Sequence, residues 1–556
     1  MDFVWEWTSY TKDGQLKWNR YNSSIMNILE AAYKQKKKDC CFCFNGYKYY
    51  ISLRNNTQLN LSTNKKRNIR RRDINTDSST NSPTSQYIHM NRRQHTNPTI
   101  NENSNSRLHR QHSTTHGNRT NHRQHTNPTL NENSNSRQHM NERSHRQHTT
   151  SAISNFTHSP NFITRFVQHH EFRALHSILH TEPQHMNVLQ FVFQMCTKAS
   201  ELFTQRQVPL SLKSVESIVM LSQKQCCCLL SLAFFDVTFQ NTSNKDMNGK
   251  FTLRAWLIDQ PEKLKCILEY FSTMYSRSVQ NTLSWGSRKV IFFRKVTTHD
   301  TNGLERMLLN CHDPLKRVRV LTNNEKIEDA KGTLQADFAN EFIGGGVLRH
   351  GSVQEEIRFT ISPECLVSVL ICERMQTNES IVIIGAERFC RYTGYGRTFK
   401  YVGKFNENVT EIDSYGALNI RIVAFDALDV QRNPSQQYSQ RVLSRDIMKL
   451  YSALSPSGIV DNNRSNVFST GNWGCGVFSG DPKWKFMQQW VVASFTNKTL
   501  HYYTYNDPRL HTLDSIHTSL IRANVTVSQL YQYLVHETRN RSHSDLFRNI
   551  MTHFNL

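Results

Sequence analysis

The side chains best suited to chemistry lie in one short stretch, residues 335–359, with the sequence QADFANEFIGGGVLRHGSVQEEIRF. It contains the consecutive glycines Gly344, Gly345 and Gly346 and, after a short spacer, the run Gln354, Glu355 and Glu356. A glycine run permits positive φ and close backbone approach, and the N–H groups of such a loop can cradle phosphate. Two adjacent carboxyls that are buried repel each other, so one can keep a proton near neutrality. A protonated carboxyl of this kind suits the general acid of glycosidic bond cleavage.

The residues alone leave a second interpretation open. A glycine run is often a plain turn, and Glu355 and Glu356 could be an exposed acidic pair at the start of a helix, where the helix dipole favours negative charge. The spacing by itself does not decide between this arrangement and a buried catalytic pair.

The composition limits the class of protein. The 556 residues carry a formal charge of +23, and apolar residues make up 37%. This length allows several domains. We expect no transmembrane helix and no secretory signal, because there is no apolar run of about 18 residues and MDFVWEWTSYTKDG lacks a basic region followed by an apolar stretch. The clustered cysteines, such as Cys226, Cys227 and Cys228, predict buried thiols in a reducing compartment, nuclear and/or cytoplasmic. No ligand spacing indicates a metal or another cofactor.

The elements that must position these groups fall into five segments. Residues 1–72 predict a small α+β domain with a helix over 24–35 and a hairpin of strands 40–46 and 47–53, joined at Asn45-Gly46. Residues 73–153 repeat RQHTNPT[IL]NENSNSR and have almost nothing to bury, so we expect a disordered His/Asn/Ser-rich linker. Residues 154–287 predict a helical subdomain, residues 288–545 a catalytic domain, and residues 546–556 a tail.

The globular part predicts an α/β fold. Helices are expected over 162–179, 188–203, 214–235, 362–375 and 483–495, with Ser362 as a possible cap before Pro363. Strands are expected over 289–296, 332–340, 380–387, 419–428 and 499–507. Continuous apolar strands such as IVII and IVAF suit a sheet covered by helices on both faces.

The stretch GGGVLRHGSVQEE resembles the signature of the poly(ADP-ribose) glycohydrolase family. ADFAN upstream, RYTGYGRTFKY at 391–401, IVAFDAL at 422–428 and TGNWGCGVFSGD at 470–481 are similar to further motifs of that family, in the same order. LSQKQCCCLLSLAFF at 221–235 resembles a helix of its accessory region. The resemblance implies a macrodomain-like mixed sheet flanked by helices, with a helical accessory subdomain, and hydrolysis of ribose–ribose O-glycosidic bonds in poly(ADP-ribose) to release ADP-ribose.

The resemblance also implies residue roles. Glu356 would protonate the leaving ribose oxygen and then activate water, Glu355 would orient the ribose, and Gln354 would help to hold it. Asp337 and Asn340 would line the same pocket, and the glycines would let the backbone reach the diphosphate. Tyr395 would cover the terminal ADP-ribose. Ile327 and Glu328 would form the adenine-recognising pair. The second nucleotide loop would contain Asn472, Gly474, Cys475, Gly476 and Phe478. Trp473 is expected in the core, and Cys475 has no nearby base that would make it a nucleophile.

The N-terminal segment resembles the WWE domain family. Trp5-Glu6-Trp7, Trp18 and the closing pattern from Gln58 to Arg71 carry the likeness. WWE domains of one class bind the iso-ADP-ribose unit of poly(ADP-ribose), so the resemblance implies that Gln58 and Arg67 contact the ligand, with Tyr49 or Tyr50 near the ring. Other WWE domains bind only protein, and the basic end KKRNIRRR could be a nuclear localisation signal or a nonspecific polyanion patch.

The sequence is therefore compatible with three functions. The first is a hydrolase of poly(ADP-ribose) and poly-ADP-ribosylated proteins that carries its own polymer-binding module. The second is a reader that has kept the pocket without turnover. The third is a basic nucleic-acid-binding protein, although no helix-turn-helix, zinc-finger or RNP pattern is present, so nucleic acid is expected to bind only nonspecifically, if at all.

Overall fold

The structure is a computed structural model, and it divides into two units, residues 1–132 and 133–556. It describes residues 3–10, 16–21, 23–35, 39–44, 47–60, 65–73, 161–203, 208–237, 245–280, 285–322, 325–407, 411–457, 466–539 and 545–556. The expected linker beyond Asp73, the expected Asn45-Gly46 turn and residues 154–160 of the helical segment lie outside these described residues.

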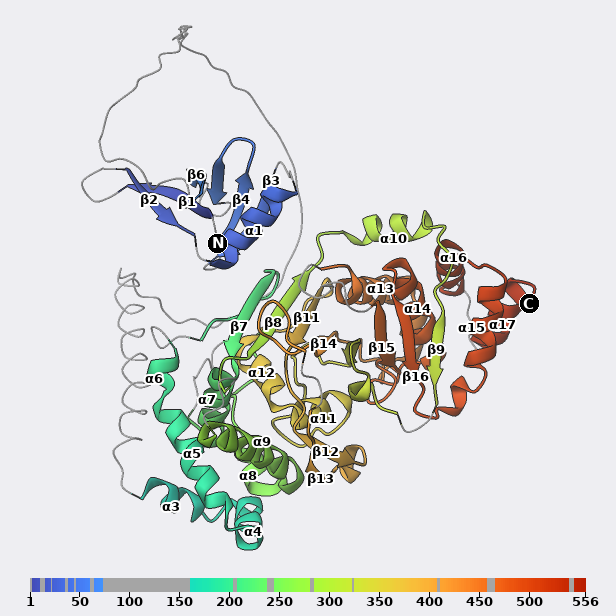
Figure 1. Ribbon diagram of the computed structural model, residues 1–556. Helices are drawn as coiled ribbons and strands as arrows, with labels where there is room; N and C mark the ends of the chain where they lie inside the picture. The colour runs from blue at the N-terminus through green and yellow to red at the C-terminus, as the bar shows by residue number, and fades with distance from the viewer. Residues whose placement is uncertain are drawn as a thin grey trace, which may run out of the picture. The chain divides into compact units, whose positions relative to one another are not determined.

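The described part of the N-terminal unit is a six-stranded antiparallel sheet in the order β2-β1-β6-β5-β4-β3, with one helix (Figure 1). Its elements are β1 (Phe3–Tyr10), β2 (Leu16–Arg20), α1 (Ser23–Lys34), β3 (Asp39–Phe44), β4 (Tyr47–Ser52), β5 (Thr57–Asn60) and β6 (Lys65–Asp73). The helix buries Ile25 and Leu29 against Trp5, Ile51 and Ile69. The predicted helix and the pairing of the two predicted strands are confirmed.

The second unit is built on an eight-stranded mixed sheet in the order β7-β8-β11-β14-β10-β15-β16-β9. The strands are β7 (Ser217–Ser222), β8 (Lys289–Val296), β9 (Val318–Leu321), β10 (Leu334–Asp337), β11 (Glu379–Ile384), β14 (Arg421–Ala424), β15 (Val467–Gly471) and β16 (Thr499–Tyr503). A separate hairpin joins β12 (Cys390–Thr393) and β13 (Lys400–Lys404). The strands from β14 to β9 run parallel, so the loops that leave their carboxyl ends gather at one edge of the sheet.

Helices cover both faces of this sheet (Figure 1). One face carries α4 (Arg173–Thr181), α5 (His185–Thr197), α7 (Gln223–Phe234), α8 (Arg254–Asp259), α9 (Pro261–Val279), α11 (Gln354–Ile361) and α12 (Val367–Ile371). The other carries α10 (Thr301–Leu309), α13 (Gln440–Leu454), α14 (Pro482–Phe495), α15 (Leu513–Arg522), α16 (Val527–Glu537) and α17 (Leu546–His553). In β11, Ile381 and Ile383 pack into the first core, whereas Val382 and Ile384 pack into the second. The predicted α/β sheet with two covered faces is confirmed.

Short elements complete the unit. They are α3 (Phe162–Val167), α6 (Ala199–Leu202) and the 3₁₀ helices η3 (Ile327–Asp329), η4 (Pro363–Leu366), η5 (Gly396–Thr398), η6 (Pro434–Tyr438) and η7 (Pro508–Leu510). No helix in the described ranges is both long and apolar enough to span a membrane.

One predicted helix is wrong over its first part. Residues 217–222 form strand β7 at the sheet edge, where Ile218 and Met220 point outward while Val219 and Leu221 are buried. This alternation is the period of a strand, and the helix begins only after Ser222, whose side chain and that of Gln225 form a capping box.

Other boundaries differ from the prediction as well. The helices expected over 162–179 and 188–203 are each divided in two, and the one expected over 362–375 is a 3₁₀ turn followed by α12, which ends at Ile371. Ser362 occupies the cap position before Pro363, but its side chain makes no capping hydrogen bond. Residues 546–556, expected as a tail, instead contain α17, because Leu546, Phe547 and Ile550 are buried in the second core.

Candidate active site

The two adjacent glutamates lie in the first turn of α11 and are both buried, with 3% of Glu355 and 7% of Glu356 exposed. The two interpretations left open by the sequence are therefore both partly right: the pair is at a helix start, and it is inside the protein. Partial positive charge at a helix N-terminus stabilises carboxylates there.

Backbone N–H groups hold each carboxyl at both oxygens. Glu355 accepts from Asn340 N at 3.0 Å and from Gly344 N at 2.6 Å. Glu356 accepts from Gly346 N at 2.9 Å and from Val353 N, the residue before α11, at 2.9 Å. The glycine loop thus fixes the orientation of both carboxyls.

This use of the loop differs from the diphosphate cradle that the resemblance implies. Gly344 N and Gly346 N donate to the glutamates, and Gly345 N donates to Phe342 O at 3.0 Å. The glycines are needed for another reason at Gly345, where φ is +48° and an added Cβ would lie 2.7 Å from Glu356 Oε1 and 2.8 Å from Glu355 Oε2. A side chain there would occupy the space of the carboxyls.

Asp337 ends β10 beside this pair and is fully buried, and neither of its carboxyl oxygens has a hydrogen-bond partner within the described part of the chain. Burial raises the pKa of Asp337 to about 8; nearby Arg358 opposes the shift, and Glu356 adds to it. Burial, followed by the charges of Asp337 and Glu356, also raises the pKa of Glu355 well above its usual range. At neutral pH the cluster therefore keeps protons, as expected for buried carboxyls in mutual contact.

Gln354 and Asn340 tie the cluster to the strand and loop. Gln354 accepts from Phe338 N at 2.7 Å and donates to Ala336 O at 3.0 Å, so its side chain bridges α11 to the end of β10. Asn340 accepts from Phe342 N at 3.0 Å through its side chain. Both predicted residues thus lie at the carboxyl pocket, where they shape its walls.

Three side chains from the helical part donate hydrogen bonds to carbonyl oxygens of the glycine loop. No sequence motif pointed to them. Lys263 of α9 donates to Val347 O and Arg349 O, both at 2.9 Å, and to Gly351 O at 2.5 Å. Asn248 donates to Gly345 O at 3.0 Å, and Trp256 donates to Val347 O at 2.9 Å. Burial lowers the pKa of Lys263 to about 8, while the charge of Glu356 acts in the opposite direction. One signal was present in the sequence: Lys263 stands four residues before Ile267 and seven before Tyr270, on the apolar face of the helix, where a lysine is rare unless paired.

Tyr395 lies close to Gln354 and Glu356, with 56% of its surface exposed. Burial of its hydroxyl end raises its pKa, and the backbone N–H of Gln354 and the charge of Glu356 both act on the same hydroxyl. Gly396 N also donates to Ser352 O at 2.8 Å, which joins the tyrosine turn to the glycine loop. The structure therefore brings Tyr395 to the predicted catalytic residues.

Ile327 and Glu328 lie in η3 and meet a residue that the sequence did not single out, Tyr505. Burial raises the pKa of Tyr505 well above its usual range, with Glu328 and Tyr395 adding to the shift and the Ile327 N–H opposing it. Glu328 accepts from Tyr392 OH at 2.6 Å. Exposed aromatic rings at 395 and 505 thus lie around the predicted adenine-recognising pair.

The second loop follows β15, at the same edge of the sheet as the end of β10. Asn472 does not point freely into a pocket, because it donates to Thr504 O and accepts from Tyr502 OH, both at 3.1 Å. Phe478 packs partly against the second core, and Trp473 is fully buried, as expected. Gly474 has φ +73° and no room for a Cβ beside Ala427, whereas Gly476 faces open space. Burial raises the pKa of Cys475 to about 12, so its thiol stays protonated at neutral pH.

Within the described residues, no group of three or more His, Cys, Asp or Glu side chains is arranged to hold a metal ion.

In the N-terminal unit, the register places the three predicted ligand residues on neighbouring strands. Gln58 lies directly opposite Arg67 and Ile51, so Tyr49, two residues before Ile51, shares their face of the sheet. Gln58 accepts from Tyr21 OH at 2.6 Å, and the Arg67 guanidinium lies 4.3 Å from the centre of the Trp7 ring. The tryptophans also have structural roles, since Trp5 is buried and donates to Glu30 at 3.1 Å.

Comparison with known families and proteins gives three matches along the chain. Residues 306–512 match the family model for the macro domain fold of poly(ADP-ribose) glycohydrolase, residues 182–294 match the model for its helical domain, and residues 3–71 match the WWE domain model. The two glycohydrolase models together span more than half of the 556 residues.

Individual relatives are more distant. Probable poly(ADP-ribose) glycohydrolase 2 of Arabidopsis thaliana is 28% identical over 366 residues, which cover 58% of this chain and 70% of that protein. Poly(ADP-ribose) glycohydrolase 1 of Caenorhabditis elegans is 34% identical over 310 residues, which cover 52% of this chain and 36% of that protein. A crystal structure of poly(ADP-ribose) glycohydrolase from Deinococcus radiodurans in complex with ADP-ribose is 16% identical, covering 42% of this chain and 94% of that one, with a TM-score of 0.24.

Proposed function

The chain belongs to the poly(ADP-ribose) glycohydrolase family, and we propose that it cleaves the ribose–ribose O-glycosidic bonds of poly(ADP-ribose) with Glu356 as general acid and base. The observation that carries this proposal is the carboxyl pocket: Glu355 and Glu356 are buried and held at all four oxygens by backbone N–H groups, beside Asp337 and near the exposed Tyr395. Donors fixed before the substrate arrives need no reorganisation during the reaction.

The role that we assign to each carboxyl follows from its surroundings. Glu356 is the more exposed of the two glutamates and lies nearest Gly345, Gly351 and the Tyr395 hydroxyl, so it meets a ligand that enters under Tyr395. It would protonate the leaving ribose oxygen as the sugar gains oxocarbenium character, and the resulting carboxylate would then take a proton from the attacking water. Glu355 and Asp337, whose pKa values are raised, keep the protons of the cluster close to Glu356 and orient the ribose.

The test is release of ADP-ribose from an automodified polymerase. Glu356→Gln keeps the size of the side chain but cannot transfer a proton, so the rate should fall about 10²–10⁴-fold, the usual contribution of general acid–base catalysis. Glu364→Gln is the matched control: Glu364 is another buried carboxyl whose pKa burial raises, to about 7, but it contacts Gln223 and Glu387 instead of the glycine loop. A Glu356→Gln enzyme that releases ADP-ribose at the wild-type rate would reject this assignment.

The competing function, a reader without turnover, makes the opposite prediction for the wild-type chain. It would bind the polymer and release no ADP-ribose, and Glu356→Gln would then change nothing in that assay. Preferential, salt-sensitive binding to DNA over ADP-ribose polymer would favour the third function, a basic nucleic-acid-binding protein.

We also propose that the WWE-like unit binds the polymer through Gln58, Arg67 and Tyr49. Their shared face and the half-buried guanidinium of Arg67 suit recognition of a phosphate beside a base. A tethered binding unit raises the local concentration of polymer at the active site. Arg67→Met should therefore raise the apparent KM for long polymer several-fold and leave kcat unchanged, while exposed Arg54→Met serves as the control. Equal KM values for both variants and the wild type would show that the unit does not bind polymer through Arg67.

A further inference from the structure

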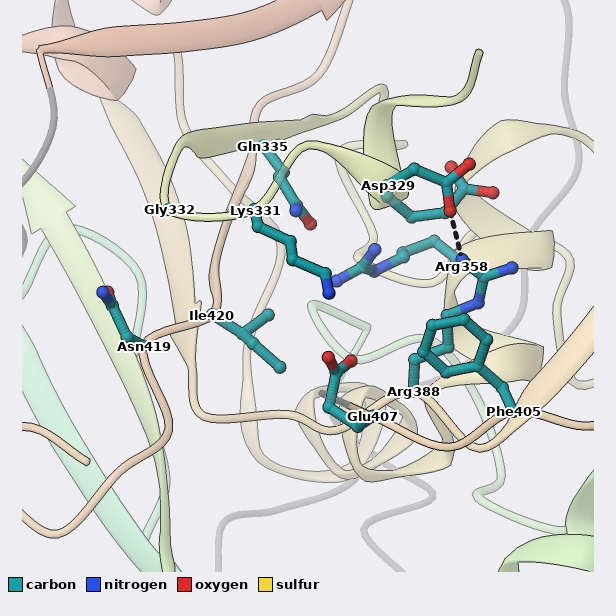
Figure 2. A pocket seen from close by; sticks show the side chains of 11 residues that line it. Asp329, Lys331, Gly332, Gln335, Arg358, Arg388, Phe405, Glu407, Asn419 and Ile420 are labelled. Carbon is teal, nitrogen blue, oxygen red and sulfur yellow. Dashed lines mark hydrogen bonds and ion pairs between the residues drawn. The ribbon is translucent and has the colours of Figure 1, made fainter. Parts of the chain in front are cut away.

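A cavity of about 220 Å³ lies beside the carboxyl pocket, and the proposed reaction does not use it (Figure 2). It is lined by residues from η3 and the turn after it, from β10 and α11, and from three loops: Glu328, Asp329, Lys331, Gly332, Gln335, Arg358, Arg388, Phe405, Glu407, Asn419 and Ile420. Eight of the eleven lining residues carry polar or charged side chains, unlike the linings of apolar voids that stay empty and dry.

The central group is the guanidinium of Arg358. Only 5% of Arg358 is exposed, and its buried Nε has no hydrogen-bond partner within the part of the chain that the structure describes. No ion pair joins it to another described side chain, and burial raises the pKa of Asp337, a carboxyl on which the charge of Arg358 acts, to about 8. A buried cation without a partner is costly, so it indicates a missing counter-charge.

In Figure 2 the side chains of Arg358 and Lys331 both extend into the cavity that they line. The third cation of the lining, Arg388, is already paired with Asp329 at 2.6 Å. Glu328 is likewise engaged, since it accepts from Tyr392 OH. Arg358 and Lys331 are therefore the positive charges that remain to meet a ligand.

The cavity also contains acceptors without donors. The side-chain oxygens of Gln335 and Asn419 are buried and lack partners among the described residues. Their amide nitrogens are fixed by donation to Ala330 O at 2.9 Å and to Glu411 at 2.6 Å, so these two oxygens cannot be exchanged for donors by a flip. The carboxylate of Glu407 lies on the lower wall in Figure 2. A suitable ligand must therefore be an anion that also carries hydrogen-bond donors.

We propose that this cavity binds a phosphate-like oxyanion that keeps a proton, with Arg358 and Lys331 holding its charged oxygens and Gln335 accepting from its hydroxyl. Arginine and lysine are the residues that bind phosphate most often, arginine through its planar fork. The volume accommodates a phosphate together with water or a small organic group.

The cavity adjoins the active site along two elements. Gln335 and Asp337 are two residues apart in β10 and therefore share a face of the strand, while Arg358 follows Glu356 by two residues in α11. A phosphate in the cavity would neutralise Arg358, the one charge that lowers the pKa of Asp337. Phosphate bound there would thus strengthen retention of the proton on Asp337.

The test uses the full-length chain and inorganic phosphate as the probe, in a thermal unfolding series at pH 7 with ionic strength held constant by KCl. A ligand that binds only the folded state raises Tm with concentration. We expect Tm to rise with phosphate, and sulfate, which carries no proton at pH 7, to bind at least about tenfold more weakly. No phosphate dependence, or an equal effect of sulfate, would overturn the proposal.

Variants locate the binding. Lys331 is exposed, so Lys331→Met should fold and should weaken phosphate binding about tenfold, as expected for loss of one charge-assisted hydrogen bond. Lys245→Met, at an exposed lysine outside the cavity, is the matched control and should keep the wild-type response. Equal phosphate responses in both variants would place the anion elsewhere and reject the cavity. Glu356→Gln should retain phosphate binding even where it loses hydrolysis, so the outcomes for the cavity and for the proposed reaction are separable.

A phosphate group could come from free phosphate compounds or from the polymer itself, and competition distinguishes the two. If the cavity takes free phosphate, Glu356→Gln should bind ADP-ribose with the same Kd in the presence and absence of phosphate. If the cavity takes the diphosphate of the substrate, phosphate should raise that Kd, and Lys331→Met should abolish the competition. Competition that survives in Lys331→Met would show that phosphate acts in the carboxyl pocket and would contradict the proposal.

Discussion

Two neighbouring pockets on either side of α11 differ in how their polar groups are satisfied. In the carboxyl pocket, every oxygen of Glu355 and Glu356 accepts a backbone N–H bond. In the cavity on the other side, Arg358 Nε and Gln335 Oε1 have no partner among the described residues. The two glutamates of the first pocket are therefore held in place before a substrate arrives, as expected of a preorganised catalytic site, and only Asp337 beside them has carboxyl oxygens without a partner among the described residues of that pocket. The polar groups of the second pocket find partners only when a ligand binds there. Substitutions in the first pocket should therefore lower activity, whereas replacement of Arg358 in the second should leave Tm unchanged or slightly higher.

Gly345→Ala disturbs the preorganised pocket. Its effect should be larger than the effects of substitutions at Lys263, Asp337 and Arg358. The new Cβ would lie 2.7 Å and 2.8 Å from oxygens of the two glutamates, so at least one carboxyl must move. A displacement of about 1 Å at a catalytic group can cost about 100-fold in rate, and we expect a loss of that size in kcat/KM for ADP-ribose release.

Gly416→Ala separates this clash from backbone strain. Gly416 also has a left-handed φ, +82°, but an added Cβ would meet only Lys289 Cγ at an ordinary 3.6 Å. It should lose stability like Gly345→Ala and keep its activity. Equal activity in the two variants would show that the glycine loop does not position the carboxyls.

Lys263→Met removes the support behind the glycine loop. Arg349 O and Gly351 O would lose the Lys263 donor, and Val347 O would keep only the Trp256 donor. Buried acceptors left without a partner cost about 1–3 kcal/mol each. We expect about tenfold lower kcat/KM together with a lower Tm. Lys265→Met, two residues along α9 in a part-exposed pair with Glu262, should change neither quantity by much. An unchanged kcat/KM in Lys263→Met would show that the loop holds its shape without the helical part.

Asp337→Asn tests whether the carboxyl pocket keeps its protons. The folded-state pKa of about 8 lies above the usual value near 4, so between these pH values the folded state binds more protons than the unfolded state. The free energy of unfolding should then fall with rising pH, by about 1.4 kcal/mol per pH unit for one proton. Urea unfolding of the wild type between pH 5 and 8 should show this decline. Asp337→Asn should reduce the slope by the share of one proton, and the raised pKa of Glu355 accounts for a decline that remains. An identical slope in the variant would mean that Asp337 is already ionised.

Arg358→Met tests the second pocket, and its effect on the protein without phosphate should be the smallest of these substitutions. Replacing an unpartnered buried cation by an apolar side chain of similar length removes a desolvation cost, and such replacements are often neutral or stabilising. In phosphate-free buffer Tm should stay the same or rise slightly, and it should no longer respond to phosphate. A marked fall of Tm without phosphate would show that Arg358 is already satisfied in the folded protein.

The sequence predicted the parts of this molecule that are governed by local pattern. The apolar strands 380–384 and 421–424 place the sheet correctly, and the glycines and glutamates of the motif lie together in the folded chain. It failed where two patterns merge: the strand Ser217–Ser222 continues into the apolar helix that begins at Gln223, and only the capping pair of Ser222 and Gln225 separates them.

Contacts between distant residues lay beyond the sequence. Lys263 and Asn248 reach the glycine loop from about 90 residues away, and no spacing rule links them to it. The same holds for Tyr505, which joins Glu328 and Tyr395 only because the parallel strands end at one edge. The use of Gly344 and Gly346 N–H groups to hold the glutamates, instead of facing a phosphate, depends on the fold of the loop and could not be derived from the glycines themselves.

A crystal structure of Glu356→Gln with ADP-ribose would show directly whether the carboxyl pocket is the site of hydrolysis. We expect the nucleotide at the carboxyl edge of β10 and β15, its adenine between Tyr395 and Tyr505, and its terminal ribose within hydrogen-bond distance of the side chain at 356. A nucleotide lodged in another part of the protein, with the side chain at 356 turned away from the ribose, would contradict the proposed role of Glu356.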